Sequence, residues 1–295
     1  MTNAFQRSRE VMRLSFYVIK ADKELLWFPV LSSIFSAFFS LAVLFPTVLL
    51  QLLQGSINDF TWNAIYYLWL FVIYFGLALI STFFGVCTCY TAKIRFEGGD
   101  ATLGQSIKYG FKRFGSVAAW ASISAIWGLL MALLQNLANR LGTVGKVVLQ
   151  ILRGAMSFMW NIATIFVIPA ITYYDLGPKA AIKKSVETLK KTWGESIIRY
   201  FGLGLMRFLF GLLGIAVFGG LSVVFFIWVP VIWLGITLAV LGVVYLIIMN
   251  LVFNVANMVY NTALFVYADT GSVPKGWKKD VLANTFQTKP ELGNR

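Results

Sequence analysis

The most constraining feature of this chain is a long segment in its C-terminal third that carries no charge. No Asp, Glu, Lys or Arg occurs between Phe208 and Ala268. About 20 apolar residues in a helix cross a bilayer, so this segment is too long for one crossing and too apolar for a soluble core element. Pro230 interrupts it, and proline cannot continue a helical hydrogen-bond ladder. The segment therefore predicts two membrane spans, at about residues 198–228 and 233–267.

The composition supports an integral membrane protein. Hydrophobic residues make up 59% of the chain and charged residues 13%, whereas soluble domains carry about 25% charged residues. Histidine is absent from the sequence, which removes imidazole proton shuttles and the commonest metal ligand. Cys87 and Cys89 would point to different faces of a helix, so we expect neither a disulfide nor a metal site. No cofactor is expected.

Apolar runs bounded by charged residues predict six spans in all. The other four lie at about 26–53, 64–92, 115–138 and 154–174. Lys and Arg are concentrated in the termini and the even-numbered connections, which the positive-inside rule assigns to the cytoplasm. We therefore expect a multi-pass protein of the cell inner membrane with both termini cytoplasmic, one transmembrane domain over residues 1–287 and a polar tail over 288–295. The net charge of +13 follows from this topology and does not indicate nucleic-acid binding.

A basic amphipathic segment precedes each odd-numbered span, which indicates an internal repeat. In the clearest copy, residues 177–193, Ile182 and Leu189 lie on one helix face, and Lys183 and Lys190 lie on the other side. Two further copies cover residues 5–20 and 103–114. Helices of this kind lie in the headgroup plane. The predicted fold class is all-α: a polytopic membrane protein with six transmembrane helices, arranged as three hairpins in a pseudo-threefold repeat with cytoplasmic interfacial amphipathic helices.

Four asparagines in the last span fall on one helix face, because they are spaced 4, 3 and 4 residues apart. This asparagine stripe consists of Asn250, Asn254, Asn257 and Asn261. At 1.5 Å per residue it covers about 16 Å, over half the hydrocarbon thickness. A seam between packed helices explains the spacing, since amides hydrogen-bond across helices. The alternative is a polar, water-accessible path, because polar residues inside a membrane commonly have functional roles.

Other polar residues extend these two hypotheses. Asn161 and Thr164, in a fourth span that Pro169 is expected to kink, are further candidates for a ligand or pathway surface. The candidates for binding anionic lipid are Lys183, Lys184, Lys190, Lys191, Arg199 and Arg207. Arg207 is the one charge expected within a span. It either extends back to the cytoplasmic headgroups or binds a lipid phosphate or an anionic solute.

Two stretches of the sequence resemble a known group of proteins. One runs Ile168-Pro-Ala-Ile-Thr-Tyr-Tyr-Asp-Leu-Gly-Pro-Lys-Ala-Ala-Ile-Lys-Lys-Ser185 and continues at Lys191-Thr-Trp-Gly-Glu195. The other is Phe28-Pro29-Val30, after Ala21-Asp-Lys-Glu24. Together they resemble a prokaryotic family of six-span membrane proteins of unknown function, and more loosely the membrane domain of glycerophosphodiester phosphodiesterases. The resemblance implies the six-span fold and carries no catalytic residues.

The sequence supports more than one class of function. We put first a transport or channel-like protein with an Asn-lined surface on the sixth span. The alternative is a non-transporting membrane scaffold that binds anionic lipid or a protein partner through its basic cytoplasmic helices. We do not expect an enzyme, because the sequence shows no nucleophile motif and no paired intramembrane carboxylates. The expected partners are anionic membrane lipids, with a protein partner or a homo-oligomer left open and nucleic acid not expected.

Overall fold

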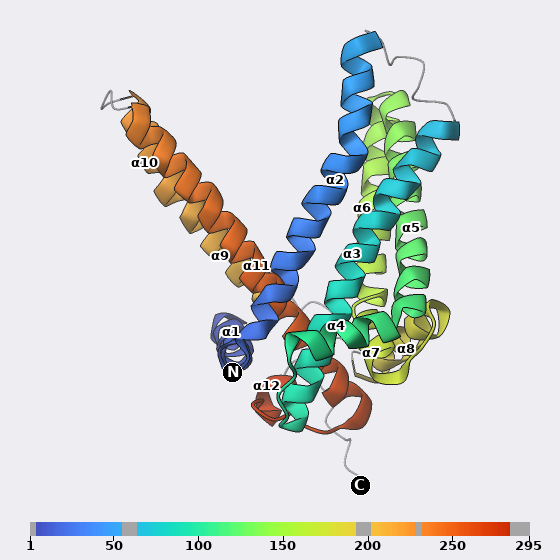
Figure 1. Cartoon of the computed structure of the whole chain (residues 1–295), viewed down its shortest axis with the longest axis vertical. Helices are drawn as coiled ribbons and strands as arrows, with labels where there is room; N and C mark the ends of the chain where they lie inside the picture. The colour runs from blue at the N-terminus through green and yellow to red at the C-terminus, as the bar shows by residue number, and fades with distance from the viewer. Residues whose placement is uncertain (1–3, 55–63, 193–201, 228–231, 284–295) are drawn as a thin grey trace. The chain divides into compact units, whose positions relative to one another are not determined.

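The computed structural model of the chain describes residues 4–54, 64–192, 202–227 and 232–283, and these residues are almost entirely helical (Figure 1). Long apolar runs with few internal Pro residues favour such helices. In chain order the elements are α1 (Ala4–Ala21), η1 (Lys23–Leu26), α2 (Trp27–Gln54), α3 (Ala64–Glu97), α4 (Leu103–Lys112), α5 (Phe114–Arg140), α6 (Thr143–Ala163), α7 (Val167–Tyr174), α8 (Pro178–Thr192), α9 (Gly202–Gly214), the π-helical turn η4 (Ile215–Gly219), α10 (Gly220–Ile227), α11 (Ile232–Thr270) and α12 (Lys279–Ala283).

Over the described residues, six helical segments are long and apolar enough to cross a bilayer. The predicted all-α fold and number of spans are confirmed. The segments are Lys23–Pro46, Tyr66–Glu97, Phe114–Arg140, Thr143–Tyr174, Met206–Ile227 and Ile232–Thr270. The pseudo-threefold repeat, the interfacial role of the amphipathic helices, and the orientation of the termini stay predictions.

The helices group into two compact units whose segments alternate along the chain. Unit 1 comprises Met1–Pro29, Ile94–Asp100 and Lys191–Arg295, and unit 2 comprises Val30–Lys93 and Ala101–Lys190. The chain passes between the units several times, so neither unit is a continuous stretch of sequence. The prediction of one transmembrane domain over residues 1–287 stays a prediction.

Unit 2 contains a helix break inside the fourth span, as the proline suggested. The helix stops at Ala163 and resumes at Val167, one turn before Pro169. Proline lacks the N–H that would bond the carbonyl four residues earlier, which weakens the helix at this point. The buried hydroxyl of Ser185 on α8 stabilises the break: it donates to the Ala163 carbonyl at 2.7 Å and accepts from the Phe166 N–H at 3.2 Å.

The short helix α4 is fixed to its neighbours in unit 2 by its small residues. A capping box between Thr102 and Gln105 begins the helix, and such a box satisfies two otherwise unpaired backbone donors. The Ser106 hydroxyl lies 2.7 Å from that of Thr91 on α3. A Cβ atom at Gly110 would lie 2.8 Å from the Cys87 sulfur, so only glycine permits this approach. The exposed side of α4 carries Phe111 and Lys112.

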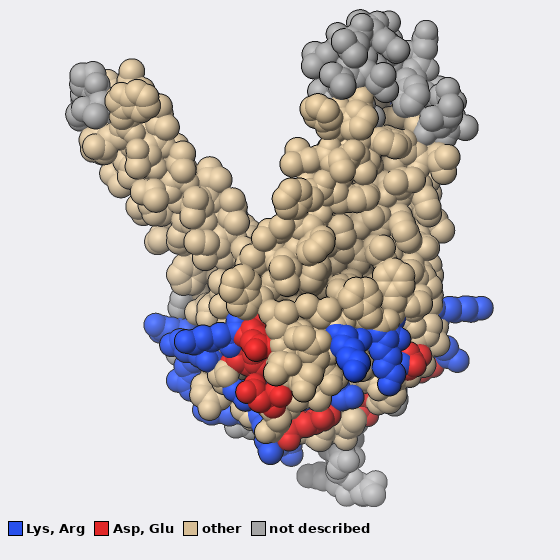
Figure 2. Space-filling model, viewed as in Figure 1, with Lys and Arg blue, Asp and Glu red and all other residues tan. Residues whose placement is uncertain are grey.

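Unit 1 is built around one long helical hairpin. The first arm is α9, the π-helical turn η4 and α10, and the second arm is α11. Helices α1 and α12 pack against the C-terminal part of α11, where Tyr260 stacks on Trp277 with ring centroids 5.8 Å apart. Figure 2 shows the hairpin as a surface free of charged side chains, with basic side chains gathered at its base, where α1 lies. The hairpin therefore has an apolar arm and a charged base.

Candidate functional site

A pocket in unit 1 lies between α9 and α11 and includes most of the asparagine stripe. Its volume is about 260 Å³, and it is lined by Leu203, Gly204, Arg207, Phe253, Asn254, Asn257, Met258 and Asn261. The 4-3-4 spacing of the asparagines brings three of them to this one face, as the sequence predicted. Arg207 supplies the one formal charge of the lining, and no carboxylate is among these residues.

Arg207 is fixed in position by the first asparagine of the stripe. A terminal guanidinium nitrogen donates a hydrogen bond to the side-chain oxygen of Asn250. The Asn250 amide nitrogen in turn donates to the Leu246 carbonyl at 2.8 Å, which fixes the direction of its oxygen. The arginine side chain itself is exposed. Its remaining N–H groups are therefore available to a ligand, and arginine carries five such donors.

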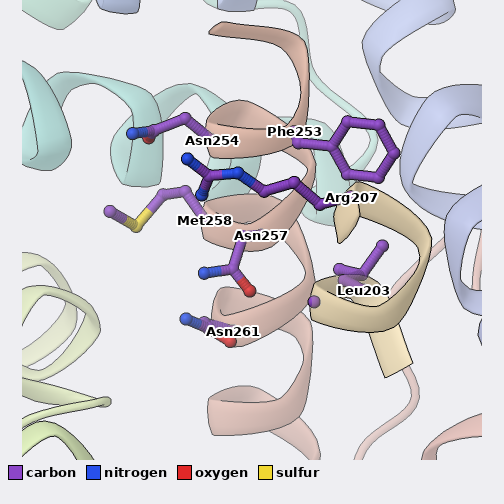
Figure 3. A pocket seen from close by; sticks show the side chains of 8 residues that line it. Leu203, Arg207, Phe253, Asn254, Asn257, Met258 and Asn261 are labelled. Carbon is purple, nitrogen blue, oxygen red and sulfur yellow. The ribbon is translucent and has the colours of Figure 1, made fainter. Parts of the chain in front are cut away.

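Two other asparagines of the stripe flank the arginine. Figure 3 shows the guanidinium end of Arg207 lying across α11 between Asn254 and Asn257, with Asn261 on the same side of the helix. Asn254 and Asn257 are exposed, and no hydrogen bond joins their side chains to the described residues. Asn261 is 8% exposed and is the most buried of the three asparagines in the lining. The pocket thus presents one cation and adjacent amide groups.

Apolar side chains complete the pocket walls. Phe253 is buried, and its ring makes an edge contact with Phe16 of α1 at 6.2 Å and a tilted contact with Phe210 of α9 at 6.1 Å. Leu203 is also buried, and Met258 is half-buried beside the amides. A ligand with both an apolar and a polar part matches these surroundings better than a small hydrated ion does.

The exposed apolar residues indicate where this hairpin meets lipid. Large apolar side chains are exposed repeatedly from Phe208, the residue after Arg207, to Ile227. At 1.5 Å per residue this stretch covers about 30 Å, the thickness of the hydrocarbon core. On α11 the exposed apolar side chains end at Ile248, two residues before Asn250. We call these exposed residues the apolar belt and infer that Arg207 and Asn250 lie at its cytoplasmic edge, given the predicted topology.

This edge changes the depth expected for the asparagine stripe. The helix α11 is about 58 Å long at 1.5 Å per residue, nearly twice the hydrocarbon thickness. The stripe begins where the apolar belt ends. Past the end of the belt, the apolar residues Val255, Val259 and Ala263 of α11 are buried against protein. We therefore infer that the stripe does not run across over half of the hydrocarbon core. Its first residue lies at the edge of the apolar belt, and the others lie beyond that edge.

The remaining candidate residues belong to unit 2 or lie outside the described residues. Asn161 is exposed near the end of α6, and the Thr164 hydroxyl donates to the Trp160 carbonyl at 2.8 Å. That these residues share a surface with the asparagine stripe stays a prediction. Lys183 forms an ion pair with Glu187 at 3.8 Å.

The rest of the basic group differs in how far it is described. Lys184 lies 4.7 Å from the Tyr174 ring centroid, and Lys190 is exposed. The side chain of Lys191 and the whole of Arg199 lie outside the described residues. Within the described ranges, no group of three or more Cys, Asp or Glu residues could hold a metal ion.

Sequence reasoning missed the apolar walls of the pocket. Leu203 and Phe253 read as ordinary span residues, because nothing in their types separates a pocket wall from a lipid contact. One signal was available: Leu203 and Arg207 are four residues apart, so they share a helix face. The pairing of Arg207 with Asn250 joins two helices and could not be read from the spacing within either one.

The fold and the site together define a class: a six-span, all-helical membrane protein with a pocket of amides and one arginine beside its fifth and sixth spans. The chain belongs to the family of unknown function DUF6159, whose model matches residues 64–275. The expected resemblance to an uncharacterised family is thereby confirmed. No curated protein and no solved structure matches the chain, and these comparisons show no similarity to glycerophosphodiester phosphodiesterases.

Proposed function

We propose that this protein binds the headgroup of an anionic phospholipid from the cytoplasmic leaflet of the inner membrane. The binding site is the pocket between α9 and α11. One observation carries the proposal: Arg207, the one charge of the pocket lining, lies directly beside the apolar belt. A phospholipid phosphate is found at that depth, because it joins the acyl region to the polar headgroup.

The chemistry of the pocket supports an anionic ligand. A guanidinium group forms strong, charge-assisted hydrogen bonds with phosphate oxygens. The lining contains no carboxylate that would neutralise Arg207 or repel the phosphate. The basic residues Lys183, Lys184, Lys190, Lys191 and Arg199 would add general attraction, because each cation near an anionic surface contributes about 1 kcal/mol.

Transport, which the sequence put first, is the second candidate. The exposed amides of Asn254 and Asn257 favour it, because they offer water a polar surface. The part of the hairpin within the apolar belt favours binding instead, because the two arms pack closely there. A Cβ atom at Gly214 would lie 2.2 Å from the Tyr245 ring, and the Tyr245 hydroxyl already donates to the Phe210 carbonyl at 3.2 Å. A polar path between these arms would have to displace that packing.

The proposal is for binding and not for catalysis, because the pocket lining offers neither a carboxylate nor a Ser, Thr or Cys nucleophile. A membrane scaffold is the role that follows most directly. A protein partner or a second copy of the chain would then be recruited beside the bound lipid, and nucleic acid is not expected.

The test is lipid binding by the full-length protein with and without the arginine. Phosphatidylglycerol and phosphatidate are compared with phosphatidylcholine by native mass spectrometry in a neutral detergent. We expect both anionic lipids to bind more tightly than phosphatidylcholine. Arg207→Gln should weaken them by roughly tenfold, since a hydrogen bond to a charged group contributes about 1.5–3 kcal/mol and 1.4 kcal/mol is a factor of ten.

The matched control is Arg13→Gln, which removes an exposed arginine of α1 that does not line the pocket. It should leave the affinity for anionic lipid within about twofold. Equal losses in the two variants would mean that the lipids respond to net charge alone, and the proposed site would be wrong. Anionic lipid binding that is unchanged in Arg207→Gln would also refute it.

A further inference from the structure

The pocket has more hydrogen-bonding capacity than a phosphate group uses. Besides Arg207 it presents the carboxamides of Asn254 and Asn257, which have no partner among the described residues. Each carboxamide both donates and accepts hydrogen bonds. A phosphodiester only accepts, so it would satisfy the amide N–H groups and leave their oxygens without donors. A hydroxyl group both donates and accepts, and it matches a carboxamide fully.

The charge of the pocket selects against the common cationic headgroups. Choline and ethanolamine place a positive group next to the phosphate. No carboxylate lines the pocket to receive it, and the guanidinium of Arg207 would repel it. A headgroup that extends the phosphate with uncharged hydroxyl groups meets neither difficulty.

The positions of the groups fit such a ligand. Asn254 follows Asn250, the partner of Arg207, by about one helical turn. Asn257 lies about 4.5 Å further along the helix axis, toward the cytoplasm. The apolar walls at Leu203 and Phe253 lie beside the arginine. The pocket therefore offers a cation that lies between two amides, with apolar walls beside it.

We propose that this pocket selects a phosphodiester that carries a polyol, such as the glycerol or inositol headgroup of a phospholipid. Its phosphate pairs with Arg207, and its hydroxyl groups exchange hydrogen bonds with Asn254 and Asn257. This inference rests on the proposed function and names the class of headgroup that the site takes. Arg207 provides the preference for an anionic lipid, and the two amides select among anionic lipids by their headgroup.

The experiment compares two anionic lipids that differ in headgroup hydroxyls. Phosphatidylglycerol has a glycerol headgroup, whereas phosphatidate has a bare phosphate with more negative charge. A site that senses only charge would therefore favour phosphatidate. We expect phosphatidylglycerol to bind the full-length protein roughly tenfold more tightly, as expected when two neutral hydrogen bonds add to the phosphate contact.

Removing the amides should abolish that preference and leave the phosphate contact. In the double variant Asn254→Leu/Asn257→Leu, phosphatidylglycerol should bind no more tightly than phosphatidate, and both should still depend on Arg207. Both side chains are exposed, so the substitutions create no cavity. The single variant Asn257→Leu should lose part of the preference. Asn139→Leu, an exposed asparagine at the end of α5, is the matched control and should keep the full preference.

The outcomes separate this inference from the proposed function. Equal binding of the two lipids, with both depending on Arg207, would overturn the polyol selectivity and leave the anionic site intact. Loss of the dependence on Arg207 would overturn both. Glycerol phosphate provides the last comparison, because the same chemistry occurs in soluble polyol phosphates. If it displaced phosphatidylglycerol at an equal concentration, the lipid source would be wrong and the site would belong to a soluble polyol phosphate.

Discussion

The guanidinium of Arg207 on α9 donates a hydrogen bond to the side-chain oxygen of Asn250 on α11. This pair joins the two arms of the unit 1 hairpin at the level where its exposed apolar residues stop. On one side of the pair the hairpin exposes the apolar belt, and on the other side α11 packs against protein. The pair therefore has two roles, since it fastens the base of the hairpin and orients the cation of the pocket.

The coupling between Arg207 and Asn250 is the first prediction. In a double-mutant cycle of Arg207→Met and Asn250→Leu, we expect an interaction free energy of about 0.5–1 kcal/mol. Interhelical hydrogen bonds in membrane proteins average about 0.6 kcal/mol, and the exposure of Arg207 keeps the value low. Unfolding free energies from titration with a denaturing detergent give the cycle. Additive effects of the two substitutions would show that the contact does not stabilise the hairpin.

Thiol labelling tests the inferred depth of the pocket. In a background of Cys87→Ala and Cys89→Ala, single cysteines replace Asn254 and Asn257, and a membrane-impermeant reagent is applied to vesicles of each orientation. We expect both positions to react from the cytoplasmic side only, because they lie beyond the apolar belt. Val243→Cys, within the belt, should stay unlabelled.

Two other labelling patterns would contradict this view. Reaction of Asn254→Cys from the outer side would indicate a continuous polar path and favour transport. Protection from both sides, in a protein that remains folded, would mean that the asparagine stripe is a sealed seam. The labelling of Val243→Cys decides whether a positive result at the asparagines reflects the pocket or general access of the reagent.

The number of spans was predictable because it depends on apolar length, which sequence records directly. The break in the fourth span was also predictable in kind, since Pro169 removes a backbone donor. The π-helical turn at Ile215–Gly219 was not. The glycines around it indicated only close helix packing. The position of a π-helical turn depends on contacts between helices, such as that between Gly214 and Tyr245.

The candidate site was predictable in its polar residues but not in its apolar walls or its depth. The 4-3-4 spacing identified the asparagine face, and Arg207 was a candidate that either extends back to the headgroups or binds a phosphate or an anionic solute. Depth depends on which apolar residues face lipid and which face protein. Val243 is exposed and Val255 is buried, yet both are valines in the same helix. Hydropathy treats them alike, so it does not separate the part of the helix with exposed apolar side chains from the part that is buried against protein.

A buried carboxylate near the start of the first span makes the stability of the protein depend on pH. Asp22 is 4% exposed. Burial raises its pKa, the negative charges of Asp100 and Glu24 raise it further, and Arg95 opposes them. The native state therefore holds this proton more tightly than the unfolded state does. Stability is highest where Asp22 is protonated and falls as the pH rises from about 4 through the folded-state pKa.

Asp22→Asn should remove this pH dependence, because an amide does not ionise. We expect the variant to be more stable than the wild type at neutral pH and nearly equal to it under acidic conditions. Thermal unfolding in detergent, measured from acidic to neutral pH, tests the prediction. Asp100→Asn is the comparison: its side chain is 82% exposed, so its effect should be the smaller. A wild-type protein whose stability rises with pH over this range would contradict the argument.

Two glycines of α4 give a matched test of the contact between α3 and α4. A Cβ atom at Gly110 would lie 2.8 Å from the Cys87 sulfur and 3.0 Å from the Phe83 ring, whereas one at Gly104 would meet nothing within 4 Å. Gly110→Ala should destabilise the protein by about 1–3 kcal/mol, the usual cost of overpacking. Gly104→Ala should be neutral or slightly stabilising, because alanine favours helix. Equal effects would mean that α4 does not pack closely on α3.

The hydroxyl of Ser185 should be essential to the helix break in the fourth span. It donates to the Ala163 carbonyl and accepts from the Phe166 N–H, and it is fully buried. Ser185→Ala leaves both backbone groups without this partner, so we expect a loss of about 1–3 kcal/mol in unfolding free energy. The control is Ser122→Ala, since the Ser122 hydroxyl only donates to the Ala118 carbonyl in its own helix. If the two substitutions had the same small effect, water or a backbone shift would be satisfying the break instead of Ser185.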